Sequence, residues 1–194
     1  MGERGVRRSI LLLVSSMSAG GRSVRLGPRI VRILRGGGWE VAVRLTTPGD
    51  DPAALAAQVA SDSIVAALGG DGYLGAVARG CHDSGALFVP FPGGRGNDLC
   101  RALGIGTDPL ARARDVAWLG FVSGTAGDEA VAGRARRATD ALASRVRPLD
   151  GMWVRSRDGV RLALGVVSVG LDARANILAN ESSLTSGPLA YGYG

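Results

Sequence analysis

The sequence predicts an α/β fold, an open and mostly parallel sheet with flanking helices, followed by the start of an incomplete β-rich second domain. Short apolar runs alternate with segments whose apolar residues recur at helical spacing, the pattern of strands joined by helical crossovers. Two glycine-rich turns, at residues 69–72 and 93–96, directly follow predicted strands. After Pro148 the pattern changes to short strands. We therefore expect an α/β domain at residues 1–148 and the beginning of a second domain at residues 149–194.

The first predicted strand is the continuous apolar run at residues 10–14, which a small polar loop at residues 15–22 follows. Such a run is typical of a fully buried parallel strand. Residues 24–34 place apolar side chains at helical spacing and arginines on the other face, so they predict a helix that ends at glycines 36–38. The N-terminal residues do not predict a secretory signal, because the apolar run of five residues is shorter than the roughly 7–15 that a signal needs.

The alternation of strands and helices continues through the rest of the first domain. It predicts strands at residues 40–45, 63–68 and 86–90, and helices at residues 51–60, 73–79 and 97–103. Because parallel strands end at one edge of a sheet, the ligand site is expected at their carboxyl ends.

The C-terminal part is predicted to change from helix to strand. Residues 107–147 are expected to form two helical pieces with a break around residues 120–127. Strands at residues 152–155 and 161–169, with the turn pair Asp158-Gly159 between them, predict a hairpin. The chain ends within a predicted helix start, and a lone hairpin is marginal in water. We therefore expect a fragment, or a natural truncation whose second domain is incomplete.

Charge and composition narrow the classes of function. The net charge is +6 and all 23 basic residues are arginine, but they are scattered without interleaved aromatic residues. This pattern disfavours a nucleic-acid partner and suits a mild attraction to anionic lipid. No apolar stretch approaches the roughly 18 residues of a transmembrane segment. The single histidine, His82, is expected to be solvated. The isolated cysteines Cys81 and Cys100 favour a cytoplasmic location, and the attraction to anionic lipid suits a peripheral position at the inner membrane surface.

The two glycine turns are candidate phosphate sites. A glycine-rich turn at the carboxyl end of a buried strand lets backbone N–H groups approach a phosphate, and the following helix N-terminus adds a favourable dipole. A P-loop is excluded because the chain has no lysine.

Asp71, the only acid of the first turn, is a candidate to orient Mg²⁺ or its water shell, or to take a proton from an attacking hydroxyl. Asn97 and Asp98 are candidates either to hold a ribose or base edge or to cap a helix, and capping is favoured for Asp98.

Three motifs in order carry a resemblance to a known family: a serine- and glycine-containing loop after the first strand, GGDG after the third, and PGGRGNDLCRALGI after the fourth. Over residues 8–105 the chain resembles the diacylglycerol kinase catalytic family, a structural relative of NAD kinases, and SVGLDA within residues 167–176 is weakly similar as well. The resemblance implies transfer of the ATP γ-phosphate, with Mg²⁺, to the hydroxyl of a lipid such as diacylglycerol. The nucleotide-site residues that it implies are Ser18, Gly21, Gly69, Gly70, Asp71, Gly72, Gly94, Gly96, Asn97 and Asp98.

Several positions depart from the family pattern. They are Ser15 and Ser16 for an Asn-Pro pair, Ala19 for a glycine, Tyr73 and Arg95 for threonines, and Gly75 and Ala76 for an Asn-Glu pair. Arg95 is expected to bind the nucleotide by a charge-assisted hydrogen bond to a phosphate oxygen. The missing Asn-Glu pair argues against an NAD-like substrate.

An ATP-dependent lipid kinase with Mg²⁺, acting on a lipid at a membrane surface, is therefore the leading hypothesis. Two alternatives stay open: a kinase acting on a soluble substrate such as NAD, and a nucleotide-binding remnant of the fold without catalysis. The truncation and the lost threonines favour the remnant. A homodimer is compatible with the sequence.

Overall fold

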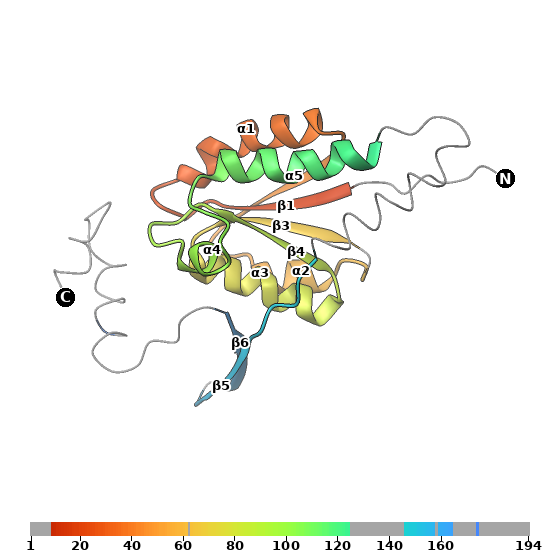
Figure 1. The fold of residues 1–194 in the computed structure, drawn as a ribbon. Helices are drawn as coiled ribbons and strands as arrows, with labels where there is room; N and C mark the ends of the chain where they lie inside the picture. The colour runs from red at the N-terminus through yellow and green to blue at the C-terminus, as the bar shows by residue number, and fades with distance from the viewer. Residues whose placement is uncertain (1–8, 62, 125–145, 158, 165–173, 175–194) are drawn as a thin grey trace.

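The computed structural model describes residues 9–61, 63–124, 146–157, 159–164 and 174. Its centre is a four-stranded sheet in the order β2-β1-β3-β4, in which all neighbouring strands are parallel (Figure 1). The predicted open parallel sheet is confirmed. The strands are β1 (Ser9–Ser15), β2 (Glu40–Thr46), β3 (Ile64–Gly69) and β4 (Leu87–Pro92).

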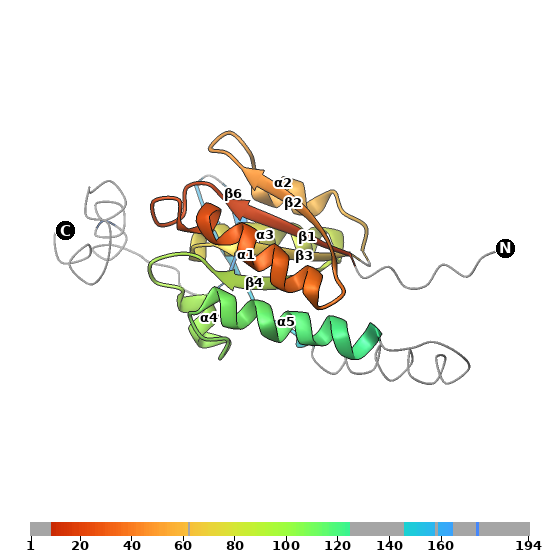
Figure 2. The same cartoon turned by 90° about the horizontal axis from the view of Figure 1, so that it is seen from above.

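Helices cover both faces of the sheet. Two of them, α1 and α5, lie side by side on one face, and α2 and α3 lie on the other, as the two views in Figures 1 and 2 show. The short helix α4 lies at the carboxyl edge of the sheet, just beyond the end of β4. The helices are α1 (Arg22–Gly36), α2 (Pro52–Ala57), α3 (Asp71–Ser84), α4 (Asp98–Ala102) and α5 (Pro109–Gly124).

The core has two halves because side chains alternate between the faces of each strand. Ile10, Leu12 and Val14 of β1 pack with α1 and α5 on one face, together with Phe91. Leu13 points to the other face, where it packs with α2, α3 and α4. Both central strands are therefore buried on both sides, which explains why they read as continuous apolar runs.

Two helices are longer than the sequence predicts. The expected helix at residues 73–79 is part of α3, which begins at Asp71 and ends at Ser84. Gly80 weakens the helical pattern, but a side chain there would overlap the backbone oxygen of Ala53 in α2, so close packing of the two helices requires the glycine. The expected break around residues 120–127 is wrong at Gly120, because α5 continues to Gly124. Residues 125–145 lie outside the described residues.

A hairpin follows the α/β domain, as the sequence predicts. Its antiparallel strands are β5 (Met152–Ser156) and β6 (Gly159–Ala163), and it lies beside α3 (Figure 1). Trp153 of β5 packs edge-on against His82 of α3, with ring centroids 5.8 Å apart. The strand predicted at 161–169 is β6, which begins at Gly159 and ends at Ala163; residues 165–169 lie outside the described residues. The domain boundary at residue 149 stays a prediction.

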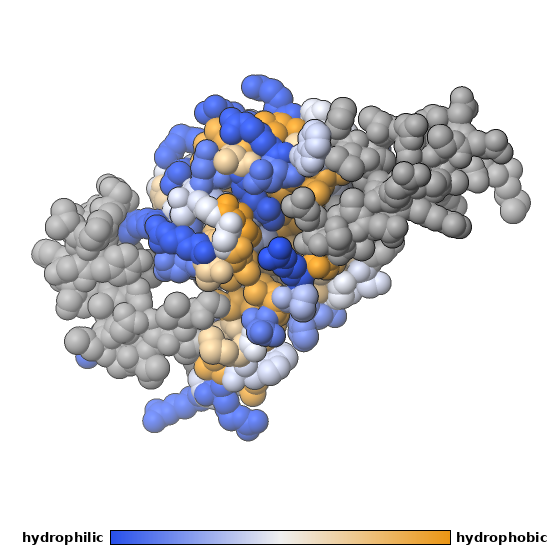
Figure 3. Space-filling model, in the orientation of Figure 1, coloured by the Kyte–Doolittle hydropathy of each residue, from blue (hydrophilic) through white to orange (hydrophobic). Residues whose placement is uncertain are grey.

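The exposed side of α1 is strongly basic, because it carries Arg22, Arg25, Arg29, Arg32 and Arg35. Figure 3 shows hydrophilic side chains along the upper rim of the molecule, over α1 and α5, with apolar residues between them. None of the helices among the described residues combines the length and the apolar character needed to cross a bilayer.

Candidate active site

The two glycine turns lie against each other at the carboxyl edge of the sheet. The strands that carry them, β3 and β4, are neighbours, and the backbone N–H of Gly93 donates a hydrogen bond to the carbonyl of Gly69 at 2.8 Å. A Cβ atom on Gly94 would lie 2.5 Å from the Cα of Gly70. The backbones of the two turns are thus in direct contact. In the sequence, the only indication of this contact is that each turn follows a predicted strand.

The glycines of these turns serve two different purposes. A side chain at Gly93 would overlap the hydroxyl of Ser23, and a Cβ on Gly69 would lie 2.5 Å from the ring of Tyr73. These positions, with Gly94, need glycine for packing within the protein itself. A Cβ on Gly72 meets no described atom within 4 Å apart from its chain neighbours and the backbone of its own helix. Gly72 therefore leaves open space that a ligand can use.

The loop after β1 reaches the same edge of the sheet. Ser18 accepts a hydrogen bond from the backbone N–H of Gly70 through its hydroxyl oxygen at 3.1 Å. Ala19, Gly20 and Gly21 all have positive φ, at 45°, 61° and 78°, and turn the chain sharply into α1. The structure thus brings Ser18 to the first glycine turn and uses Gly21 as the left-handed residue that precedes the helix.

Asp71 is the first residue of α3 and faces the neighbouring turn. One carboxylate oxygen, Oδ1, accepts a hydrogen bond from the backbone N–H of Leu99 at 3.0 Å. The other oxygen, Oδ2, makes no hydrogen bond with a described residue. A Cβ atom built on Gly96 would lie 3.2 Å from Oδ2 of Asp71 and 3.1 Å from Oδ2 of Asp98. Two carboxylate oxygens therefore face one small volume beside the second turn.

Asn97 shapes the second turn with its own side chain. Its buried amide accepts a hydrogen bond from the N–H of Gly94 at 2.8 Å and donates one to the carbonyl of Gly94 at 3.1 Å. Its backbone is left-handed, with φ of 56°. Asn97 occupies the N-cap position of α4 without a capping side-chain bond. Its contact with a ribose or base stays a prediction.

The capping role expected for Asp98 is taken by Asp71. Asp98 is exposed and forms an ion pair with Arg101, with 3.0 Å between Oδ1 and Nη1. The free N–H of α4 is instead bound by Asp71, from 28 residues away. No local signal in the sequence could have identified that pair. Arg95 is exposed on the second turn, and its contact with phosphate stays a prediction.

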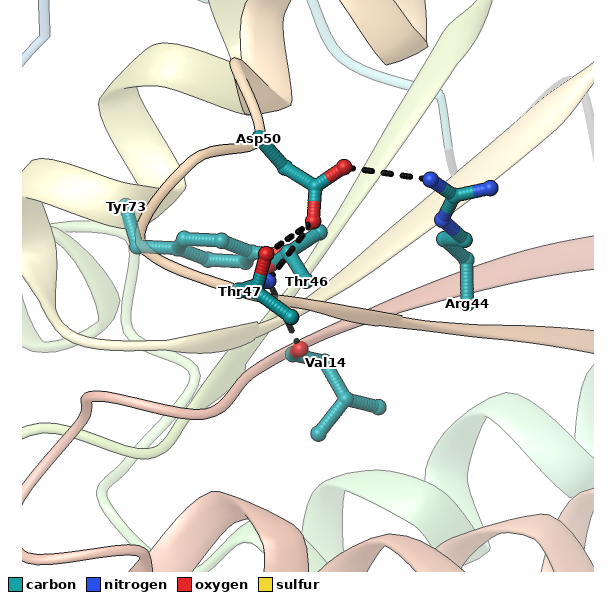
Figure 4. A network of polar contacts seen from close by, with 6 residues as sticks. All are labelled: Val14, Arg44, Thr46, Thr47, Asp50 and Tyr73. Carbon is teal, nitrogen blue, oxygen red and sulfur yellow. Dashed lines mark hydrogen bonds and ion pairs between the residues drawn. The ribbon is translucent and has the colours of Figure 1, made fainter.

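Tyr73, which replaces a threonine of the family pattern, belongs to a network at the end of β2 (Figure 4). The Thr46 hydroxyl bonds to the Val14 carbonyl at 3.2 Å and to the Tyr73 hydroxyl at 3.1 Å. Because Thr46 has a single hydroxyl proton and the carbonyl can only accept, Tyr73 is the donor in the second bond. Burial raises the pKa of the Tyr73 phenol. The tyrosine thus fixes the first turn to the edge of the sheet instead of exposing a hydroxyl to a ligand.

The neighbouring turn at residues 47–50 is closed by a carboxylate. Asp50 accepts hydrogen bonds from the backbone N–H and hydroxyl of Thr47 at 2.7 and 2.8 Å, and it forms an ion pair with Arg44 at 3.1 Å (Figure 4). The hydrogen bond from the Thr47 backbone, followed by those from the Thr47 hydroxyl and Arg44, lowers the pKa of Asp50.

A cleft of about 530 Å³ lies between α3, α4 and the hairpin. Asp71, Gly72 and Asp98 line one part of it, and residues of β5 and β6 form the opposite wall. A second hollow, of about 610 Å³, lies between α1 and β2 and contains none of the predicted site residues. The first cleft is therefore the candidate active site.

The donor set of the cleft suits one kind of metal ion. The described residues include no group of three or more metal-binding side chains, so a closed structural metal site is not among them. Mg²⁺ in phosphate-transfer sites is commonly held by one or two carboxylates together with the phosphates and water. Asp71 and Asp98 meet that requirement.

Comparison with known proteins agrees with this arrangement. The family model described as the diacylglycerol kinase catalytic domain matches residues 9–145, well over half of the chain. No curated protein matches the chain significantly. The matched segment includes the loop after β1 and both glycine turns, and the family is one of kinase-type phosphotransferases. The chain therefore belongs to the diacylglycerol kinase catalytic domain family.

Proposed function

We propose that the chain is the nucleotide-binding part of an ATP-dependent lipid kinase, which transfers the γ-phosphate of ATP to a lipid hydroxyl, with diacylglycerol as the expected acceptor. The observation that supports this most is the contact between the two glycine turns at the carboxyl ends of β3 and β4. It gathers backbone N–H groups, the N-terminus of the 14-residue helix α3 and a free carboxylate oxygen in one place.

Different groups in the cleft would have different roles in the reaction. Backbone N–H groups of Asp71 and Gly72, in the first turn of α3, would hold phosphate oxygens, since Gly72 leaves the space open and the N–H of Gly70 is already bonded to Ser18. Mg²⁺, when bound, would neutralise charge on the phosphates. The lipid hydroxyl oxygen would attack the γ-phosphorus, the bond to the bridging β–γ oxygen would break, and ADP would leave. Oδ2 of Asp71 would either orient the metal and its water or accept the hydroxyl proton.

The first test is Mg·ATP binding to the full 194-residue chain by calorimetry. Asp71→Asn keeps an oxygen that can accept the Leu99 hydrogen bond but removes the charge, so the local structure is retained while metal-dependent affinity should fall. Gly72→Ala should leave folding intact, because the new Cβ meets no other described element within 4 Å, yet weaken ATP binding if phosphate approaches this position. Gly36→Ala, also in open space but at the end of α1, is the matched control.

The second test is phosphorylation of diacylglycerol in mixed micelles. We expect Asp71→Asn to reduce the rate by about 100-fold or more, the usual contribution of a general base. ATP binding without transfer to any lipid would favour the non-catalytic alternative. Transfer to NAD would identify the soluble-substrate alternative. A folded chain that binds no Mg·ATP would contradict the proposal for the described domain.

A further inference from the structure

One face of α3 forms the floor of the cleft. Asp71, Gly72, Gly75, Ala76 and Arg79 all line it, at the spacing of residues on one side of a helix. The three residues in the middle carry at most a methyl group, so they place no polar side chain between the acid at one end and the guanidinium at the other. The cleft is therefore open along about two turns of the helix.

The two ends of this floor carry opposite charges. Asp71, with Asp98 nearby, lies at the carboxyl edge of the sheet. Arg79 lies eight residues further along α3, about 12 Å at 1.5 Å per residue. Arg161 of β6 lines the cleft from the opposite wall. The cleft is thus acidic where the phosphates are proposed to bind and basic further along the helix.

Neither arginine forms an ion pair within the described part of the chain, and Arg161 is exposed at the rim of the cleft. The ion pairs among the described residues are Arg44–Asp50 and Arg101–Asp98. Arg79 is partly buried, and a partly desolvated guanidinium without a counter-charge is unfavourable. An anion placed between the two walls would supply that counter-charge.

We propose that Arg79 and Arg161 form an anion subsite that binds a phosphate group of a ligand lying along the cleft. Guanidinium groups bind phosphate oxygens in a bidentate manner, and two of them from opposite walls can hold one phosphate. Apolar residues that line the same cleft, Leu99, Leu162 and Leu164, suit the uncharged part of such a ligand. The subsite rests on the proposed function for the identity of its ligand. The phosphate belongs either to the nucleotide or to the headgroup of an anionic lipid, since diacylglycerol itself carries no phosphate.

The subsite is tested by calorimetry on the full chain at low salt with three probes: Mg·ATP, glycerol 3-phosphate and inorganic phosphate. The variants are Arg79→Gln, Arg161→Gln and the double substitution. Arg155→Gln is the matched control, because Arg155 is an exposed arginine of the same hairpin that does not line the cleft. We expect the double variant to weaken binding of at least one probe tenfold or more, and the control to leave binding unchanged.

The probes distinguish the sources of the phosphate. Weaker Mg·ATP binding alone in the double variant assigns the subsite to the nucleotide. Weaker glycerol 3-phosphate binding with unchanged Mg·ATP binding assigns it to the headgroup of an anionic lipid. If the chain binds no Mg·ATP but binds inorganic phosphate through the two arginines, the subsite stands and the proposed function fails. Equal binding of every probe by the double variant and the control, or no binding of any probe by the unaltered chain, would overturn the subsite.

Discussion

Replacing Gly94 with alanine should separate the two glycine turns and destabilise the domain. The new Cβ would lie 2.5 Å from the Cα of Gly70, whereas carbon atoms in contact rest at about 3.5–4.0 Å. The turns must therefore move apart by about an ångström, which takes the 2.8 Å hydrogen bond from Gly93 to Gly69 beyond its favourable range. Overpacking costs about 1–3 kcal/mol, and the weakened hydrogen bond adds about 1 kcal/mol.

The measurement is urea unfolding of the full chain followed by circular dichroism, with thermal unfolding in parallel. For a chain of this size each kcal/mol corresponds to about 2–4 °C in Tm, so a total cost of about 2–4 kcal/mol should lower the Tm of Gly94→Ala by roughly 4–16 °C. Gly75→Ala is the matched control within helix α3, because its Cβ meets no protein atom within 4 Å. It should stabilise the chain by about 0.5–1 kcal/mol through helix propensity. Equal stability of the two variants would refute the contact between the turns.

Three further outcomes follow from individual side chains. Tyr73→Phe removes the hydroxyl bond at the edge of the sheet and should cost about 0.5–1.5 kcal/mol in urea unfolding; an unchanged midpoint would show that this bond adds no stability. The pKa of Asp50 is lowered, so its stabilising contribution is present above the ordinary aspartate pKa and is lost as pH falls through the lowered value; Asp50→Asn should make unfolding less sensitive to pH in this acid range, and an unaltered acid limb would contradict the assignment. Burial raises the pKa of Cys81 to about 12 and that of Cys100 to about 11, so both thiols should react with a thiol reagent at pH 8 only after unfolding; rapid reaction of the folded chain would show that they are accessible.

Much of the fold could be predicted because its signals are local. The apolar runs of β1 and β3 are continuous because both faces of these strands are buried, and this distinguishes them from surface strands. The hairpin was predictable from the glycine between two short strand patterns, and Gly159 indeed has φ of 117° at the start of β6. The ends of α3 were not predictable, because Gly80 reads as a helix breaker until its contact with Ala53 is known.

The site was predicted in position more than in detail. The glycine turns indicated where phosphates could bind, but their spacing could not distinguish Gly94, which is required by Gly70, from Gly72, which faces open space. The bond between Asp71 and Leu99 joins residues 28 positions apart, so it depends on tertiary structure alone. The sequence shows Tyr73 only as the replacement of a threonine, and it does not indicate that the tyrosine hydroxyl bonds to Thr46.

The hairpin that walls the cleft has consequences for how the domain responds to its ligand. A two-stranded hairpin is marginal in water by itself, and the described contacts hold β5 and β6 to α3 at one edge, including the rings of Trp153 and His82. A molecule that touches both α3 and β6 adds its own binding free energy to the docking of the hairpin. By linkage, the docked hairpin raises the affinity for that molecule by the same factor. Ligand binding in the cleft and docking of the hairpin on α3 are therefore one coupled equilibrium. A higher ligand concentration holds the hairpin more firmly to α3.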